Sequence, residues 1–333
     1  MSRKNPLFRL TGVVTLSLVY VSFASAAVTV DSQLPDYAKT GDVAGSIKSI
    51  GSDTMNNEMA LWAEGFRSFH PEVKVEVEGK GSSTAPPALI AGTSNFGPMS
   101  RSMKSKEIDE FEKRFGYKPV QLRTSIDMLA VYVHKDNPIK GLTLQQVDAI
   151  FSETRKGGYT KDITTWGDLG LTGEWKDKPI SMYGRNSASG TYGYFKDHAL
   201  FKGDYKNAVK EQPGSSSVVQ GIASDKFGIG YSGIGYMTSD VRAVPLSGET
   251  GDGVTYMAAE PDNAYSGDYP LARFLYLSVN YKPGSQLDEL RREFVRFIFS
   301  KQGQEVVVKD GYLPVPAAVA REELKSVGIE PTF

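Results

Sequence analysis

Apolar and polar positions along the chain predict strands and helices in turn. From Met55 to Phe69, apolar residues recur at spacings of four and three, which places them on one face of a helix. Val73, Val75 and Val77 then alternate with charged residues, as in a strand. The order strand, helix, strand, helix predicts an α/β sheet. The apolar positions of the helix are Met55, Met59, Trp62, Phe66 and Phe69.

The same reading extends over the rest of the chain. Thr143 with Gln146 makes a capping box, which predicts a helix from Leu144 to Phe151. We expect two helices to close the chain, at roughly 286–299 and 302–309. Further strands are predicted at 46–50, 128–133, 178–183, 227–236 and 271–279, and a short helix at 217–223.

Two strands, at 125–133 and 270–279, are interpreted as crossovers between two lobes. Lobe I would then be discontinuous and lobe II continuous, and two crossing strands permit a central cleft to close by a hinge motion. The prediction is an α/β protein with two lobes, a two-strand hinge and a central cleft. The expected parts are a polar, loosely docked arm at 27–45, lobe I at 46–126 and 271–333, and lobe II at 127–270.

The first 26 residues have the features of a secretory signal peptide. Three basic residues, Arg3, Lys4 and Arg9, precede a short apolar run, and Ala24-Ser25-Ala26 matches an A-x-A cleavage signal. The whole chain has 38 basic and 39 acidic residues. Removal of the signal peptide takes away three basic residues, so the mature chain has 35 basic and 39 acidic residues and a net charge of −4. We expect a mature protein in the bacterial periplasm, or a secreted one.

Composition argues against several classes of function. The chain has no cysteine, which excludes disulfides, thiolate metal sites and cysteine nucleophiles. The negative charge and the lack of a basic patch argue against nucleic acid as a partner. The histidines, His70, His134 and His198, lack the spacing of a metal site, and no G-x-S-x-G motif is present. We therefore expect neither an enzyme nor a cofactor or metal.

Three stretches rich in Gly, Ser and Thr each follow a predicted strand and precede a predicted helix. They span 51–54, 81–84 and 185–191. Free N–H and hydroxyl groups at a helix N-terminus hold an oxyanion without covalent reaction. Arg185 adds a guanidinium suited to paired bonds with oxyanion oxygens. Taken alone, each stretch is as typical of a turn or a helix cap as of an anion site. An arginine alone is as typical of an ion pair.

Taken in order, the motifs resemble those of the phosphate-binding component of Pst-type ABC importers, a type II periplasmic binding protein. The resemblance covers nearly all of the mature chain. It implies two lobes, one phosphate ion held in the cleft, and delivery to the permease and ATPase subunits of an ABC importer, without chemistry on the ligand. The motifs are Ile50–Thr54, Gly81–Ser83, Asn95–Arg101, Val131–Pro138, Arg185–Thr191, Gly228–Tyr231 and Gly311–Pro316.

The resemblance also implies roles for individual residues. Thr54 would offer its hydroxyl and, with Asp53, backbone N–H groups, and Ser82 its hydroxyl and N–H. Arg185 would pair with the phosphate oxygens. Some family members carry an aspartate where Ser100 stands, followed here by Arg101. The complete set of candidate phosphate-binding residues is Ser52, Asp53, Thr54, Ser82, Ser100, Arg101, Asp127, Arg185, Ser189, Gly190 and Thr191.

An aspartate in such a site accepts a proton from the ligand. Asp127, at the start of a crossover strand, is the first candidate for this role and Asp53 the second. Phosphate near neutral pH still carries a proton, whereas sulfate does not and would leave the carboxylate unpaired. We expect a monomeric phosphate receptor. A receptor for another tetrahedral oxyanion such as sulfate or arsenate, and a secreted phosphatase or adhesin on the same fold, are the alternatives.

Overall fold

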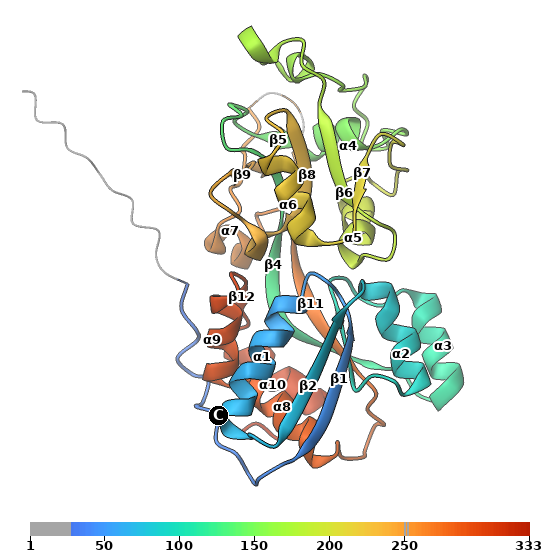
Figure 1. Cartoon of the computed structure of the whole chain (residues 1–333), viewed down its shortest axis with the longest axis vertical. Helices are drawn as coiled ribbons and strands as arrows, with labels where there is room; N and C mark the ends of the chain where they lie inside the picture. The colour runs from blue at the N-terminus through green and yellow to red at the C-terminus, as the bar shows by residue number, and fades with distance from the viewer. Residues whose placement is uncertain (1–27, 250, 252) are drawn as a thin grey trace, which may run out of the picture.

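The computed structural model describes residues 28–249, 251 and 253–333. The predicted signal peptide at 1–26 lies outside the described residues. The chain forms two α/β lobes stacked along the long axis of the molecule (Figure 1). None of the helices in the described part of the chain has both the length and the apolar character that a membrane crossing requires.

Lobe I holds the first three strands and the last three helices. Strands β1 and β3 are parallel, and β2 pairs with the other side of β1, also in parallel. Helix α1 buries Met59, Trp62 and Phe66 completely, which confirms the apolar stripe read from the sequence. The elements are β1 (Gly45–Gly51), α1 (Asn56–Phe69), β2 (Val73–Gly79), the 310 helix η1 (Ser82–Thr84), α2 (Ala85–Ala91), β3 (Phe96–Met99), α3 (Ser105–Phe115), α8 (Glu289–Ile298), α9 (Lys301–Lys309) and α10 (Ala317–Ser326).

Lobe II is built around a second set of strands. Strand β6 is parallel to β7 on one side and to β8 on the other. Helix α4 begins with the predicted capping box of Thr143 and Gln146. The elements are β5 (Leu142–Thr143), α4 (Leu144–Phe151), η2 (Trp166–Leu169), η3 (Gly173–Trp175), β6 (Ser181–Arg185), α5 (Gly190–His198), β7 (Lys210–Gln212), α6 (Ser215–Ala223), β8 (Gly228–Gly233), η4 (Ile234–Tyr236), β9 (Val241–Ala243), β10 (Leu246–Ser247) and α7 (Pro261–Ser266).

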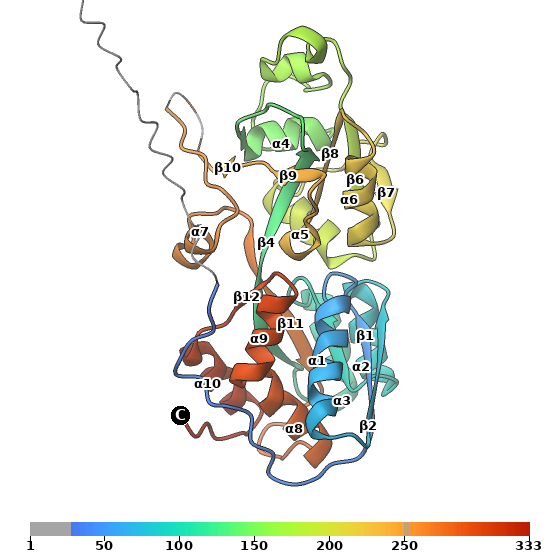
Figure 2. The same cartoon turned by 60° about the vertical axis from the view of Figure 1, so that its left-hand side comes forward.

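Two strands join the lobes. Strand β4 (Val120–His134) is antiparallel to β11 (Ala272–Val279) in lobe I and to β8 in lobe II, so it runs through both sheets (Figure 2). Its Leu122 packs in the apolar core of lobe I and its Leu129 in that of lobe II. The short strand β12 (Leu313–Pro314) also pairs with β4. This arrangement confirms the two-lobed fold with a two-strand hinge.

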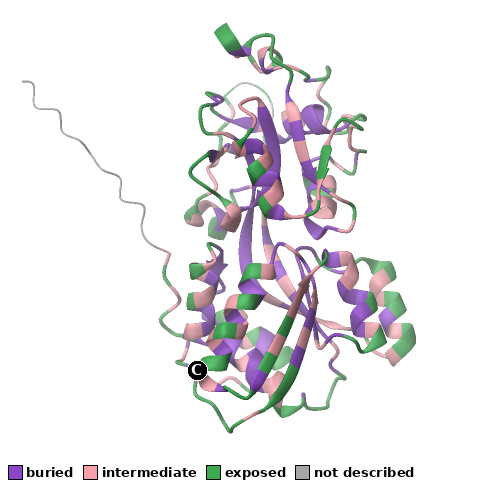
Figure 3. Ribbon diagram, viewed as in Figure 1, coloured by how far each residue is buried: buried purple, intermediate pink, exposed green. Residues whose placement is uncertain are grey.

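Two expectations for the ends of the chain are wrong. The arm at 28–44 forms no helix or strand, but it is firmly anchored, because Leu34 and Tyr37 are buried in the core of lobe I and Asp31 accepts a hydrogen bond from the N–H of Ala317 at 2.9 Å. The chain ends with three helices instead of two. Helix α10 buries Ala320 and Leu324 against the same core. In Figure 3 the buried residues follow strand β4, which joins the lobes, whereas loops at the two ends of the molecule are exposed.

One acidic side chain lies inside lobe I. Glu58 projects from α1, is completely buried, and neither of its carboxyl oxygens has a hydrogen-bond partner among the described residues. Burial raises the pKa of Glu58 well above its usual range, and the nearby carboxylates of Asp310 and Asp127 act in the same direction. Burial therefore favours the neutral, protonated form of Glu58 in the folded protein.

Glu58→Gln should stabilise the protein, increasingly as the pH rises. In the unfolded chain the carboxyl ionises near its ordinary pKa of 4.5, whereas the folded protein keeps the proton to higher pH. Folding then takes up a proton, and stability falls as the pH rises above that value. Urea unfolding should show a gain of at least about 1 kcal/mol at pH 8 and a smaller gain at pH 5.

Glu64→Gln on the exposed face of the same helix is the matched control and should change stability by less than about 0.5 kcal/mol at either pH. A gain for Glu58→Gln that is equal at the two pH values would contradict the prediction.

Candidate functional site

The three Gly/Ser/Thr stretches meet where the two lobes face each other. Each lies between the carboxyl end of a parallel strand and the start of a helix: β1 and α1, β2 and η1, and β6 and α5. The first two belong to lobe I and the third to lobe II (Figure 1). Their backbones touch directly, because the N–H of Ser83 donates to the carbonyl of Ala188 at 3.1 Å.

Four buried hydroxyl groups, which we call the hydroxyl cluster, connect the lobes at this point. Thr191 on α5 lies 2.9 Å from Thr54 and 3.3 Å from Ser100, measured between hydroxyl oxygens. The Ser82 and Ser100 hydroxyls are 3.3 Å apart, and Ser82 also accepts from the N–H of Ser100 at 3.0 Å. The structure therefore brings together four predicted site residues from four separate chain segments.

Gly190 makes the close approach of the lobes possible. A β-carbon at this position would lie 2.2 Å from the Ser82 hydroxyl oxygen and 2.6 Å from that of Ser100. Gly81 has a similar role, since its φ of 106° is unfavourable for other residues and a β-carbon would lie 2.5 Å from the Ala188 carbonyl oxygen. The glycines of the motifs thus allow the hydroxyl cluster to form.

Four of the backbone N–H groups around the cluster are without a partner in the described part of the chain. Among the described residues, nothing accepts from the N–H groups of Thr54, Met55, Ser82 or Gly190. Ser189 is the N-cap of α5, where its hydroxyl oxygen accepts from the N–H groups of residues 191 and 192 and leaves its own hydrogen free to donate. Three helix starts therefore offer donors to one place, which is the arrangement that binds an anion.

Asp53 and Arg185 form an ion pair between the lobes. The Arg185 side chain is 1% exposed and its Nη1 lies 3.3 Å from the Asp53 carboxylate. Asp53 caps α6 of the opposite lobe by accepting from the N–H of Ser215 at 2.7 Å, whereas Arg185 donates to the Ser215 hydroxyl at 2.6 Å. The Nε of Arg185 has no partner among the described residues. Burial lowers the pKa of Arg185, and the charge of Asp53 opposes this effect.

Asp127 is bound by a residue that the sequence analysis missed. Arg273 of β11 faces Asp127 of β4 across the hinge strands and donates Nε and Nη2 to Oδ2, at 3.0 and 2.7 Å. The N–H of Ile234 donates to the other oxygen, Oδ1, at 2.9 Å. Arg273 also donates to the carbonyl of Ser100 and to the hydroxyl of Thr191, both at 2.9 Å. Both charged side chains are buried.

The remaining two predicted residues stand apart from the cluster. Arg101 forms a forked ion pair with Glu107 of α3, at 2.7 and 2.8 Å, and approaches the Ser83 hydroxyl at 3.4 Å. Ser52 is buried beside β3, where its N–H donates to the carbonyl of Pro98 at 2.8 Å, and its hydroxyl has no partner among the described residues.

The charges around the site cancel in pairs. Three arginines and three carboxylates form the pairs Arg101–Glu107, Arg185–Asp53 and Arg273–Asp127. A further carboxylate lies behind the site. Burial, together with the charge of Asp127, raises the pKa of Asp310 to about 7. The field at the hydroxyl cluster therefore comes mainly from oriented N–H and O–H groups.

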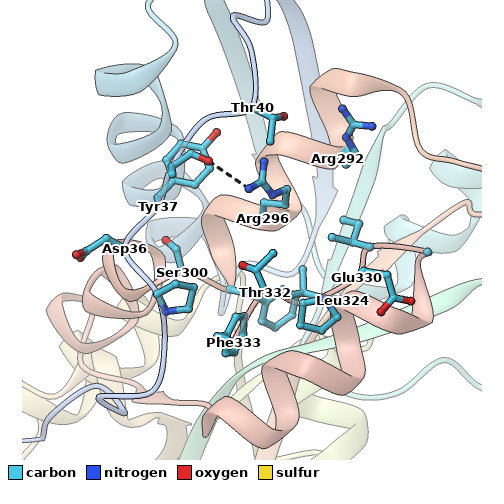
Figure 4. Close-up of a pocket in the computed structure, with 16 residues that line it drawn as sticks. Asp36, Tyr37, Thr40, Arg292, Arg296, Ser300, Leu324, Glu330, Thr332 and Phe333 are labelled. Atoms are coloured by element: carbon cyan, nitrogen blue, oxygen red, sulfur yellow. Dashed lines mark hydrogen bonds between the residues drawn. The ribbon is translucent and has the colours of Figure 1, made fainter.

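Other parts of the described chain lack a comparable arrangement for chemistry. No group of three or more His, Asp or Glu residues able to hold a metal ion occurs in residues 28–249, 251 and 253–333. A pocket of about 510 Å³ lies on lobe I between the N-terminal arm and the C-terminal segment, where Arg296 donates to the Ala38 carbonyl at 3.2 Å (Figure 4). None of the predicted site residues lines this pocket.

Comparison with known proteins places the chain in a family. The family described as the PBP superfamily domain matches residues 37–302. The phosphate-binding protein PstS of Pseudomonas aeruginosa is 52% identical over 323 residues, which are 97% of this chain and 99% of that protein.

Two solved structures have the same fold. The structure of a phosphate ABC transporter substrate-binding protein of Clostridium perfringens, described as putative and with bound phosphate, is 27% identical, covers 81% of this chain and all of its own, and gives a TM-score of 0.68. The structure of an ABC-type phosphate transport receptor of Vibrio cholerae is 24% identical and covers 81% of this chain and all of its own. Its TM-score is 0.61, and at this identity the likeness is evidence for the fold only.

Proposed function

The chain belongs to the PBP superfamily and, within it, to the PstS phosphate-binding proteins, and from this membership we propose that it captures inorganic phosphate in the periplasm and carries it to the membrane permease. It binds phosphate as the receptor component of an ABC-type phosphate importer. It is a non-enzymatic transport protein, so the ligand enters and leaves the site unchanged.

The convergence of donors at the hydroxyl cluster carries the proposal for the site. The unpartnered N–H groups of Thr54, Met55, Ser82 and Gly190 come from three helix starts. Phosphate has four oxygens to satisfy, and the hydroxyl contacts across the cluster are bonds that those oxygens would take over. The unpartnered Nε of the buried Arg185 supplies a charge-assisted donor. Asp53 and Ser189 complete the proposed lining, from which Ser52 and Arg101 stand apart.

Movement of the lobes gives access to this buried position. We assign lobe I to 46–126 and 271–333 and lobe II to 127–270, because the two apolar cores divide near these positions on β4 and β11. The cluster and the Asp53–Ser215 bond hold the lobes together when they are closed. A monomer that opens about β4 and β11 would bind phosphate, close, and present both lobes to the permease and ATPase subunits.

Arg185→Ala should weaken phosphate binding by at least about 2 kcal/mol, which is roughly thirtyfold, because it removes a charged donor from a buried anion. Titration calorimetry of the mature protein with phosphate measures the loss, and thermal unfolding confirms that the variant is folded. Lys210→Ala removes the same charge from an exposed position on the neighbouring strand β7 and should change affinity less than about twofold. Equal affinities of the wild type and Arg185→Ala would refute the proposed site.

Gly190→Ala should weaken phosphate binding at least about tenfold, because its methyl group would overlap the Ser82 and Ser100 hydroxyls, and overpacking of this kind costs about 1–3 kcal/mol. Gly193→Ala in the same helix is the control, since its nearest contact would be the Arg101 Cδ at 3.5 Å. Calorimetry gives the affinities, and small-angle scattering at saturating phosphate should give a larger radius of gyration for Gly190→Ala alone. If both variants bind phosphate equally well, the ligand lies elsewhere.

Asp127→Asn should reduce the preference for phosphate over sulfate at least about tenfold, since Asp127 is the proposed acceptor of the phosphate proton and an amide does not penalise sulfate in the same way. The ratio of the two dissociation constants at pH 7.5 is the measurement. Asp53→Asn is the rival variant. A ratio that changes in Asp53→Asn and not in Asp127→Asn would transfer the role of acceptor to Asp53.

A further inference from the structure

Arg273 is the best-connected charged side chain at the boundary of the lobes. It is 6% exposed, and four of its five N–H hydrogens are assigned to bonds with Asp127, Ser100 and Thr191. Its guanidinium also lies over the ring of Tyr194, with Cζ 5.1 Å from the ring centre. A buried arginine with this many partners is fixed in position, because any movement breaks several bonds at once.

The three hydrogen-bonded partners come from three different parts of the molecule. Asp127 belongs to the hinge strand β4, Ser100 follows β3 in lobe I, and Thr191 lies in the first turn of α5 in lobe II. Arg273 itself lies on the other hinge strand, β11. Its full set of bonds therefore forms only when Thr191 is brought against lobe I, that is, when the lobes are closed.

Arg273 also determines which oxygen of Asp127 can accept another hydrogen. Its Nε and Nη2 both donate to Oδ2, which fills the two lone pairs of that oxygen. Oδ1 accepts one bond, from the N–H of Ile234, and has one lone pair left. The forked bond thus fixes the plane of the carboxylate and leaves a single acceptor position.

We propose that Arg273 is a positioning residue of the phosphate site, which holds the Asp127 carboxylate and the Thr191 hydroxyl in place for the ligand and does so only in the closed form. The inference rests on the proposed function, because it assigns to Arg273 a role in phosphate binding and in discrimination against sulfate. Arg273 acts through its neighbours, and the selectivity of Asp127 depends on it.

The test compares Arg273→Lys and Arg273→Met with the wild type. Lysine keeps the charge but cannot make the forked bond to Oδ2 while also reaching Ser100 and Thr191. Both variants should bind phosphate at least about tenfold more weakly and should lose at least about threefold in the ratio of sulfate to phosphate dissociation constants. Arg123→Met is the control and should match the wild type, because it removes an arginine of the other hinge strand, β4, that pairs with Glu322 and Glu323 on α10.

A double-mutant cycle shows whether Arg273 acts through Asp127. If it does, the double variant Asp127→Asn/Arg273→Met should lose less selectivity than the sum, in free energy, of the losses in the two single variants. A purely structural arginine would lower the melting temperature and leave the phosphate affinity and the sulfate ratio of the soluble Arg273→Lys variant unchanged. That result, or strictly additive losses of selectivity, would overturn the inference.

The wild-type titration separates this inference from the proposed function. Phosphate binding by the wild type together with unchanged binding by Arg273→Lys overturns the role of Arg273 alone. A wild type that binds no phosphate overturns both the proposed function and the role of Arg273.

Discussion

The contact of Gly190 with Ser82 and Ser100 limits how closely the two lobes approach each other. The α-carbon of a lobe II residue lies directly against hydroxyl oxygens of lobe I, with no room for a side chain. Every other cross-lobe bond in the site, from the Thr54–Thr191 contact to the bond between Asp53 and the N–H of Ser215, needs this separation. The small residues of the motifs therefore serve the geometry of closure.

Electrostatic neutrality is the second constraint. Each of the three arginines at the site is paired with a carboxylate, and burial raises the pKa of the nearby Glu58, which favours its neutral form. A surplus of positive charge would have to be buried without a partner whenever the lobes closed in the absence of an anion, which is costly. Dipoles of N–H and O–H groups avoid this cost, since they are fixed by the helices that carry them.

Local features of the fold and the site could be read from the sequence because they depend on neighbouring residues. The stripe of α1, the capping box at Thr143 and the Gly/Ser/Thr stretches at strand ends are of this kind. Contacts that depend on register could not be read. Arg273 and Asp127 are 146 residues apart and meet only because β4 and β11 pair in one register, although a charged residue within the apolar run 271–279 was a usable signal.

The end regions were misread for a related physical reason. The described part of the arm buries Leu34 and Tyr37 in the core, and Val30 and Val43 are only partly buried against it, so few apolar positions mark the arm as part of the fold. Helix α10 follows a segment with two prolines and shows only a few buried positions, such as Ala320 and Leu324. In both cases a few well-placed apolar side chains attach a polar segment, and such anchoring depends on tertiary contacts.

If Asp127 is the acceptor of the ligand proton, as proposed above, its pairing with Arg273 would explain how an anion receptor can carry an acidic residue beside its ligand. An unpaired carboxylate about 5 Å from an anion would oppose binding by about 3 kcal/mol per unit charge at an effective dielectric constant of about 20. The guanidinium of Arg273 cancels most of this repulsion for every oxyanion alike. The carboxylate oxygen still needs a hydrogen-bond donor. A ligand that carries a proton supplies one, whereas a ligand without a proton does not. In this proposal, selectivity by protonation state is separated from overall charge, because Asp127 would supply the acceptor and Arg273 would remove its repulsion.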